Sequence, residues 1–77
     1  MKHVIDTYDV GTEEHLECIE LPVSRRKELF ELMGWQKTED EIYVYDLSEQ
    51  QLEIIEGWIG RKISSSGHLA QLAGEAD

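Results

Sequence analysis

Apolar and polar residues alternate along two stretches in the first third of the chain. The alternation runs loosely through residues 3–10 and returns in residues 16–21, with the polar residues 11–14 between them. A period of two is typical of strands, and two such runs joined by a short turn favour a β-hairpin. Pro22 follows, and because proline has no N–H to donate to a sheet, we expect the second strand to end there.

Helical patterns occupy two later stretches. In the first, Ser24 is a suitable N-cap and Gly34 a typical stop, which predicts a helix over residues 24–33. In the second, Ser48 and Gln51 have the spacing of a capping box, so we expect a helix to begin there and to end between residues 60 and 63. Its buried stripe would consist of Leu52, Ile55 and Ile59.

The stretch between the two helices is the clearest strand pattern in the sequence. Residues 41–47 read Glu-Ile-Tyr-Val-Tyr-Asp-Leu, with β-branched and aromatic side chains on both faces. Such a strand is either central in a sheet or has one apolar face left for a partner. The order β-β-α-β-α predicts an α+β fold in which a three-stranded, mostly antiparallel sheet packs against two helices.

The last residues lack a comparable pattern. Residues 64–67 read Ser-Ser-Ser-Gly, which is typical of a flexible connector, and the apolar residues beyond it show little periodicity. We therefore expect a single α+β domain over residues 1–63, followed by a flexible or weakly docked tail over residues 64–77.

The net charge of the chain indicates what kind of partner the protein could bind. Among 77 residues, 17 are acidic and 7 are lysine or arginine, which gives a formal net charge of −10. The main basic cluster, residues 25–27, is too small to favour direct nucleic-acid binding. The negative electrostatic field of such a protein attracts a basic protein. The alternative is that the acidic residues only keep the protein soluble.

Candidate chemistry is sparse. His15 and Cys18 are three residues apart on a strand, so we expect them to face opposite sides and to form neither a metal site nor a Cys-His pair. Asp6 with Asp9, or the acidic residues 39–41, would divide acid and base roles only in a shielded cleft, and we expect them to be solvated. The sequence predicts a protein that is not an enzyme and has no catalytic residue, metal site or cofactor.

A binding site is the better prediction. Glu49, Glu53 and Glu56 recur at positions i, i+4 and i+7 of the second helix, where their like charges repel one another unless a basic partner is present. A solvated helix face is the alternative. Tyr43 and Tyr45 precede this stripe and belong to a residue type that is enriched at interfaces. These five residues are the predicted partner-binding set.

The layout also resembles a known class of proteins. An acidic hairpin, a Leu-Pro step, a short helix ending Leu-Met-Gly-Trp at residues 32–35, and the run over residues 41–51 resemble small acidic bacterial immunity proteins, over about residues 1–62. This resemblance implies a non-enzymatic inhibitor of a secreted or contact-dependent toxin, commonly a nuclease. The basic toxin domain would be the partner, and the free protein would be a monomer or weak dimer.

Two alternatives remain open at this stage. One is an acidic nucleic-acid mimic, or a phage-type inhibitor of a host nucleic-acid enzyme, which uses the same electrostatics against another target. The other is a structural homo-oligomer that pairs through the apolar strand.

The single cysteine, the lack of a signal-peptide pattern and the absence of a long apolar stretch lead us to expect a cytoplasmic protein that does not contact membranes.

Overall fold

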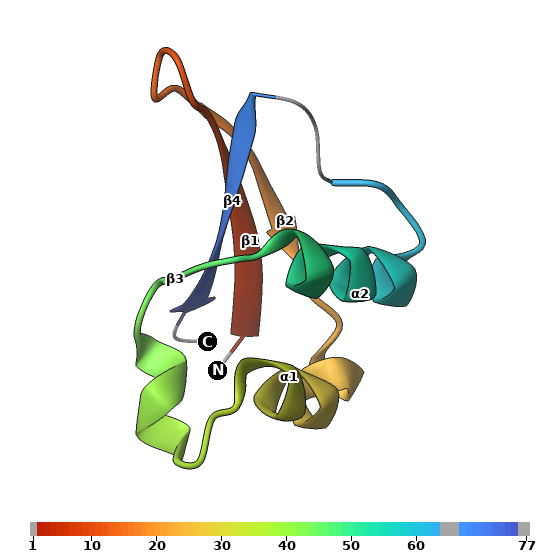
Figure 1. The fold of residues 1–77 in the computed structure, drawn as a ribbon. Coiled ribbons are helices and arrows are strands. Elements are labelled where there is room, and N and C mark those ends of the chain that lie inside the picture. The colour runs from red at the N-terminus through yellow and green to blue at the C-terminus, as the bar shows by residue number, and fades with distance from the viewer. Residues whose placement is uncertain (1, 64–66, 76–77) are drawn as a thin grey trace.

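A four-stranded antiparallel sheet with two α-helices forms the protein (Figure 1). The computed structural model describes residues 2–63 and 67–75. The strands are β1 (Lys2–Asp9), β2 (His15–Glu20), β3 (Tyr45–Asp46) and β4 (His68–Glu75). The helices are α1 (Arg26–Met33) and α2 (Glu49–Ile59), with 3₁₀ turns η1 (Val23–Arg25) and η2 (Thr38–Ile42).

The α+β class with an antiparallel sheet and two helices is confirmed, but the sheet has four strands rather than the predicted three. Their order is β2-β1-β4-β3. The additional strand, β4, comes from residues that we had placed in a tail, and it pairs with the whole of β1, from Lys2 opposite Glu75 to Asp9 opposite His68. This pairing makes β1 a central strand, flanked by β2 and β4, and its residues Val4 and Ile5 are both buried although they point to opposite faces. Residues 64–66, 76 and 77 of the predicted tail lie outside the described residues.

The hairpin and the second helix form as the sequence predicts. Ser48 Oγ accepts a hydrogen bond from Gln51 N, and Ser48 N donates one to the Gln51 side chain, which completes the capping box. Helix α2 ends at Ile59, with Gly60 as its left-handed C-cap. Gly34 closes α1 in the same way, with φ 70°. The predicted cap Ser24 is wrong, because Ser24 lies inside the 3₁₀ turn η1 and α1 begins after Arg25.

The strand predicted over residues 41–47 is largely wrong. Residues 38–42 form the turn η2, and only Tyr45 and Asp46 pair with β4, at the edge of the sheet rather than in its centre. Two side chains explain the change. Asp40 Oδ2 accepts hydrogen bonds from the backbone N–H groups of residues 36 and 37, and Glu41 is drawn into a buried ion pair with α1. Local strand propensity yields to these contacts.

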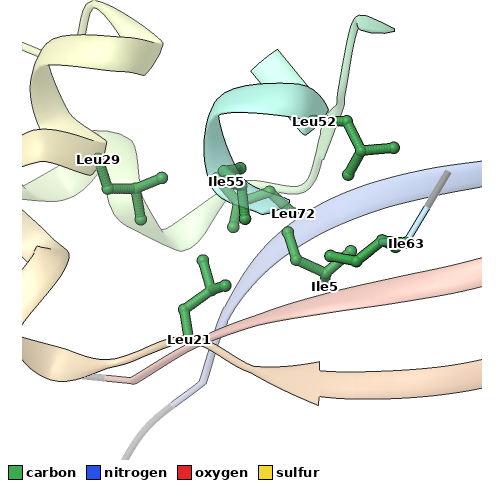
Figure 2. Packing of buried hydrophobic residues seen from close by; sticks show 7 residues of the cluster. All are labelled: Ile5, Leu21, Leu29, Leu52, Ile55, Ile63 and Leu72. Carbon is green, nitrogen blue, oxygen red and sulfur yellow. The ribbon is translucent and has the colours of Figure 1, made fainter. Parts of the chain in front are cut away.

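The hydrophobic core lies between one face of the sheet and the helices (Figure 2). Strand residues Ile5 and Leu72 meet Leu29 of α1 and Ile55 of α2, and all four are fully buried. Both helices therefore lie on the same side of the sheet. We call the opposite side the open face; along β1 it carries the even-numbered residues 2–8, since successive side chains of a strand alternate between faces.

Candidate functional site

The structure separates the three predicted glutamates of α2. Glu49 and Glu53 are exposed. Glu56 is half-buried, and its carboxylate accepts a hydrogen bond from the backbone N–H of Ile63, which ties the segment after α2 back to the helix. Glu56 therefore has a structural contact, and the predicted acidic stripe is reduced to its first two members.

The two predicted tyrosines also differ. Tyr45 is half-buried: its hydroxyl donates to the backbone oxygen of Asp40 over 2.7 Å, and its ring centroid lies 5.4 Å from that of Trp35. Tyr43 is 59% exposed. Of this pair, Tyr43 is the side chain that the structure leaves available to a partner.

Tyr43 belongs to an exposed apolar run. Its neighbours Ile42 and Val44 are 57% and 61% exposed, so three consecutive large side chains face solvent. The run leads directly into the edge strand β3. We call residues 42–46 the edge segment. Asp46 at its end and Glu49 just beyond it are both exposed, so that carboxylates follow the apolar run along the chain.

Among the residues that the structure describes, none pairs with the outer side of the edge-segment backbone. Leu47 N donates to Ala70 O over 3.1 Å, and Tyr45 lies opposite Leu72 of β4. In an antiparallel ladder, alternate residues direct their backbone groups to opposite sides. The backbone groups of Val44 and Asp46 therefore point away from β4, toward the outer edge of the sheet.

Side chains on the open face connect the edge segment to the hairpin. Asp6 lies opposite Gln71, which lies opposite Asp46, and Gln71 Nε2 donates to Asp46 Oδ1 over 3.0 Å. In the next row, Tyr8 of β1 lies opposite Leu69 of β4. Sequence reasoning missed this surface because half of it belongs to β4, which we had assigned to a tail.

A bulge corrects the prediction for His15 and Cys18. The register between β1 and β2 shifts at Thr7 and Tyr8, so that Cys18 lies opposite Asp6 while His15 lies opposite Tyr8. Both side chains consequently lie beside Asp6: His15 Nε2 is 3.0 Å from Oδ1, and the exposed Cys18 is the register partner of Asp6.

This grouping does not activate the thiol. Partial desolvation, followed by the hydrogen bond to Asp6 and the negative charge of Asp6, raises the pKa of Cys18. A nucleophilic cysteine needs the opposite shift and a histidine that takes its proton, whereas His15 here pairs with Asp6. The arrangement gives the thiol no features of a nucleophile.

A second polar group joins the buried side chains of Glu41 and His3 to the half-exposed Arg26, and it corrects the expectation that the acidic residues 39–41 are all solvated. Glu41 is 2% exposed. Its carboxylate accepts two hydrogen bonds from Arg26 of α1, 2.9 Å from Nε and 2.7 Å from Nη2. His3 Nε2 lies 3.1 Å from Glu41 Oε1, without the alignment of a hydrogen bond. We call His3, Arg26 and Glu41 the buried triad.

The triad joins three parts of the fold rather than forming an open site. It connects β1, α1 and η2, and the His3 ring stacks at a tilt on Trp35, with centroids 5.6 Å apart. The Arg26 hydrogen bonds lower the pKa of Glu41. Burial lowers the pKa of His3 and outweighs the opposing effect of Glu41. The triad therefore consists at neutral pH of an ion pair with a neutral histidine, and its role is to hold η2 in place.

Other acidic and aromatic side chains lie in several places. The hairpin glutamates are exposed, and Glu17 pairs with Arg61 over 3.1 Å. Trp35 and Trp58 pack against the core, and the Arg25 guanidinium lies 5.9 Å from the Trp58 ring centroid. In the part of the chain that the structure describes, no helix is long and apolar enough to cross a membrane, and no group of three or more His, Cys, Asp and Glu side chains is placed to hold a metal ion.

Comparison with known proteins gives one match. The model of a family described as "Domain of unknown function (DUF7683)" matches residues 2–73, a range that extends from β1 into β4. No curated protein and no solved structure matches the chain.

Proposed function

We propose that this protein, which belongs to the DUF7683 family, is an immunity-type inhibitor that binds a basic toxin domain through its edge segment. The observation that carries the proposal is the exposed apolar run of Ile42, Tyr43 and Val44, which exposed Asp46 and Glu49 follow along the chain. The protein acts by occupying a surface of the toxin, in the cytoplasm, without catalysis or a cofactor.

The apolar run supplies the short-range attraction. Fully burying a side chain of this size stabilises a complex by roughly 1.5–3 kcal/mol relative to leaving it exposed. Single exposed apolar residues are normal on monomers, but contiguous ones mark interaction surfaces. Tyr43 is the expected anchor, because a rigid aromatic ring with a polar tip gives a large contact area and one hydrogen bond.

The acidic residues supply the long-range attraction. A net charge of −10 steers a cationic protein toward this one, and exposed carboxylates close to the apolar run direct the approach to the edge segment. Glu49 and Glu53 retain this role from the predicted set. Because exposed charges are screened by salt, the association rate will fall as ionic strength rises.

The unpaired outer edge of β3 favours a protein partner. An extended segment of the toxin that lies beside Val44 and Asp46 would find free backbone groups to pair with, as in other cases of strand addition. The charge disfavours the homo-oligomer alternative, since two copies that each carry a net charge of −10 repel each other. The nucleic-acid mimic uses the same carboxylates, and the experiment below separates it from the immunity protein.

The test pairs the protein with the products of the genes adjacent to its own. A basic toxin domain among them should co-purify with it in a 1:1 complex, and its nuclease or other toxic activity should fall as the protein is titrated to equimolar amounts. Replacing Tyr43 by Ala should weaken the complex by about 2 kcal/mol or more, roughly 30-fold. Toxin activity that is unchanged in a molar excess of the protein would refute the proposal, and inhibition of a host nucleic-acid enzyme instead would favour the mimic.

A further inference from the structure

The β1–β2 turn projects beyond the helices (Figure 1). Residues of this turn and of the neighbouring strands β1 and β4 line a pocket. We propose that this pocket binds an arginine side chain of the partner, and this inference rests on the proposed basic partner. Its volume is about 290 Å³. This volume lies at the lower end of the roughly 300–1,000 Å³ that is typical of small-molecule pockets, and it leaves room for one long side chain. We call it the hairpin pocket; it is lined by Tyr8, Asp9, Val10, Glu13, Leu69 and Gln71.

The walls of the hairpin pocket are apolar and aromatic. Tyr8 and Leu69 face each other across β1 and β4, and Leu69 and Val10 are more than half exposed. A hydrogen bond of 2.8 Å from Val10 N to Gly67 O fixes the rim, and an edge contact with His15, with centroids 5.2 Å apart, orients the Tyr8 ring. Such walls suit the methylene groups of a long side chain and the planar face of its head group.

The charge at the rim selects a cation. Asp9 Oδ1 accepts hydrogen bonds from the N–H groups of Gly11 and Thr12, at 2.9 and 3.0 Å, so that its carboxylate is held at the rim in its ionised form. Glu13 is exposed beside it. Within the described residues, no lysine or arginine lines the pocket. An anion would be repelled here, whereas a cation finds carboxylates and an aromatic ring together.

Arginine fits this combination better than lysine does. A guanidinium is planar, stacks on aromatic rings and pairs with a carboxylate through two parallel hydrogen bonds, and it is less strongly hydrated than an ammonium group. Tyr8 offers the ring and Glu13 the carboxylate. Gln71, which also bonds to Asp46, makes the pocket continuous with the edge segment, so one partner can cover both.

The experiment uses the intact protein and a small probe, so that it does not depend on finding the partner. N-acetyl-arginine methylamide is titrated against ¹⁵N-labelled protein, with the lysine derivative and the neutral isostere citrulline in parallel. Arginine should give saturable shifts at the amides of residues 8–13 and 69–71, with weaker binding of lysine and little binding of citrulline. Replacing Glu13 by Gln should weaken arginine binding about two- to fivefold, as for other exposed ion pairs, while E31Q at an exposed position of α1 leaves it unchanged.

Three results would overturn the inference. They are the absence of saturable shifts at these amides, equal binding of citrulline, and equal binding of lysine. The outcome is separable from the proposed function. A protein that inhibits its toxin but does not bind arginine in the hairpin pocket refutes the inference alone. A protein that binds arginine there but inhibits no toxin refutes the proposed function and leaves the pocket assigned.

Discussion

The buried triad makes Glu41 the most informative position for stability. Replacing Glu41 by Gln keeps the shape of the side chain but removes the charge that accepts two hydrogen bonds from Arg26. A hydrogen bond to a charged group contributes about 1.5–3 kcal/mol. The glutamine oxygen retains one acceptor, and the half-exposed Arg26 regains part of its hydration, so we expect a loss of about 2 kcal/mol. The matched control is Glu17→Gln, whose exposed pair with Arg61 is worth about 0–1 kcal/mol.

Urea unfolding at pH 7, followed by circular dichroism, measures both variants. The pH dependence gives a second test. Because Arg26 lowers the pKa of folded Glu41, the contribution of Glu41 is present above the ordinary carboxyl pKa of about 4.3 and is lost as pH falls through the lowered value. The difference between the wild type and Glu41→Gln should therefore shrink in acid. A loss no larger than that of Glu17→Gln, or a difference that grows below pH 4, would refute this account of the triad.

Three further predictions concern other parts of the fold. Burial lowers the pKa of His3 in the folded protein. The free energy of unfolding should therefore fall as pH drops below about 6.5, because the histidine of the unfolded chain takes up a proton first. In His3→Gln, this fall between about pH 6.5 and lower pH should be smaller. Leu72→Ala should cost about 2–5 kcal/mol in urea unfolding, because Leu72 is fully buried, and a cost below 1 kcal/mol would contradict the placement of β4. Ser48→Ala should cost about 1 kcal/mol through loss of the cap, whereas Ser24→Ala should change little.

Sequence reasoning located the elements whose signals are local. The capping box at Ser48 and the stop at Gly34 depend on residues within one or two turns, and both were found correctly. The strand over residues 41–47 failed because its competitor is distant in sequence: Arg26 draws Glu41 into the buried triad and the chain turns there. The β-branched and aromatic residues of this stretch favour a strand, but they do not indicate a contact with a residue as distant in sequence as Arg26.

Strand β4 was missed for a different reason. Residues 68–75 contain alanine, glycine and glutamine and have no β-branched residue, so their own propensity for a strand is low. They form a strand because β1 presents a complete second edge to pair with. The single useful signal was Leu72, which is now a core residue.

The sequence indicated acidic and aromatic residues as candidates for a binding site, but it did not show how the fold arranges them. Tyr43, Glu49 and Glu53 are exposed, while Glu56 and Tyr45 are engaged in hydrogen bonds within the fold. Spacing along a helix shows which residues share one side of it. It does not show which of these residues will hydrogen-bond to the loop that follows the helix. His15 and Cys18 both lie beside Asp6 because of a β-bulge, and the residue pattern did not predict this bulge.

The most direct test of the binding surface compares two exposed valines. Val44 lies in the edge segment and is 61% exposed, and Val23 lies in η1 and is 69% exposed, so V44R and V23R make the same chemical change at similar exposure. With the basic toxin domain as titrant in a calorimeter, V44R should weaken binding at least tenfold, because it replaces an apolar contact by a like charge, and V23R should bind as the wild type does. Equal affinity of V44R and wild type would contradict the assignment of the edge segment as the binding surface.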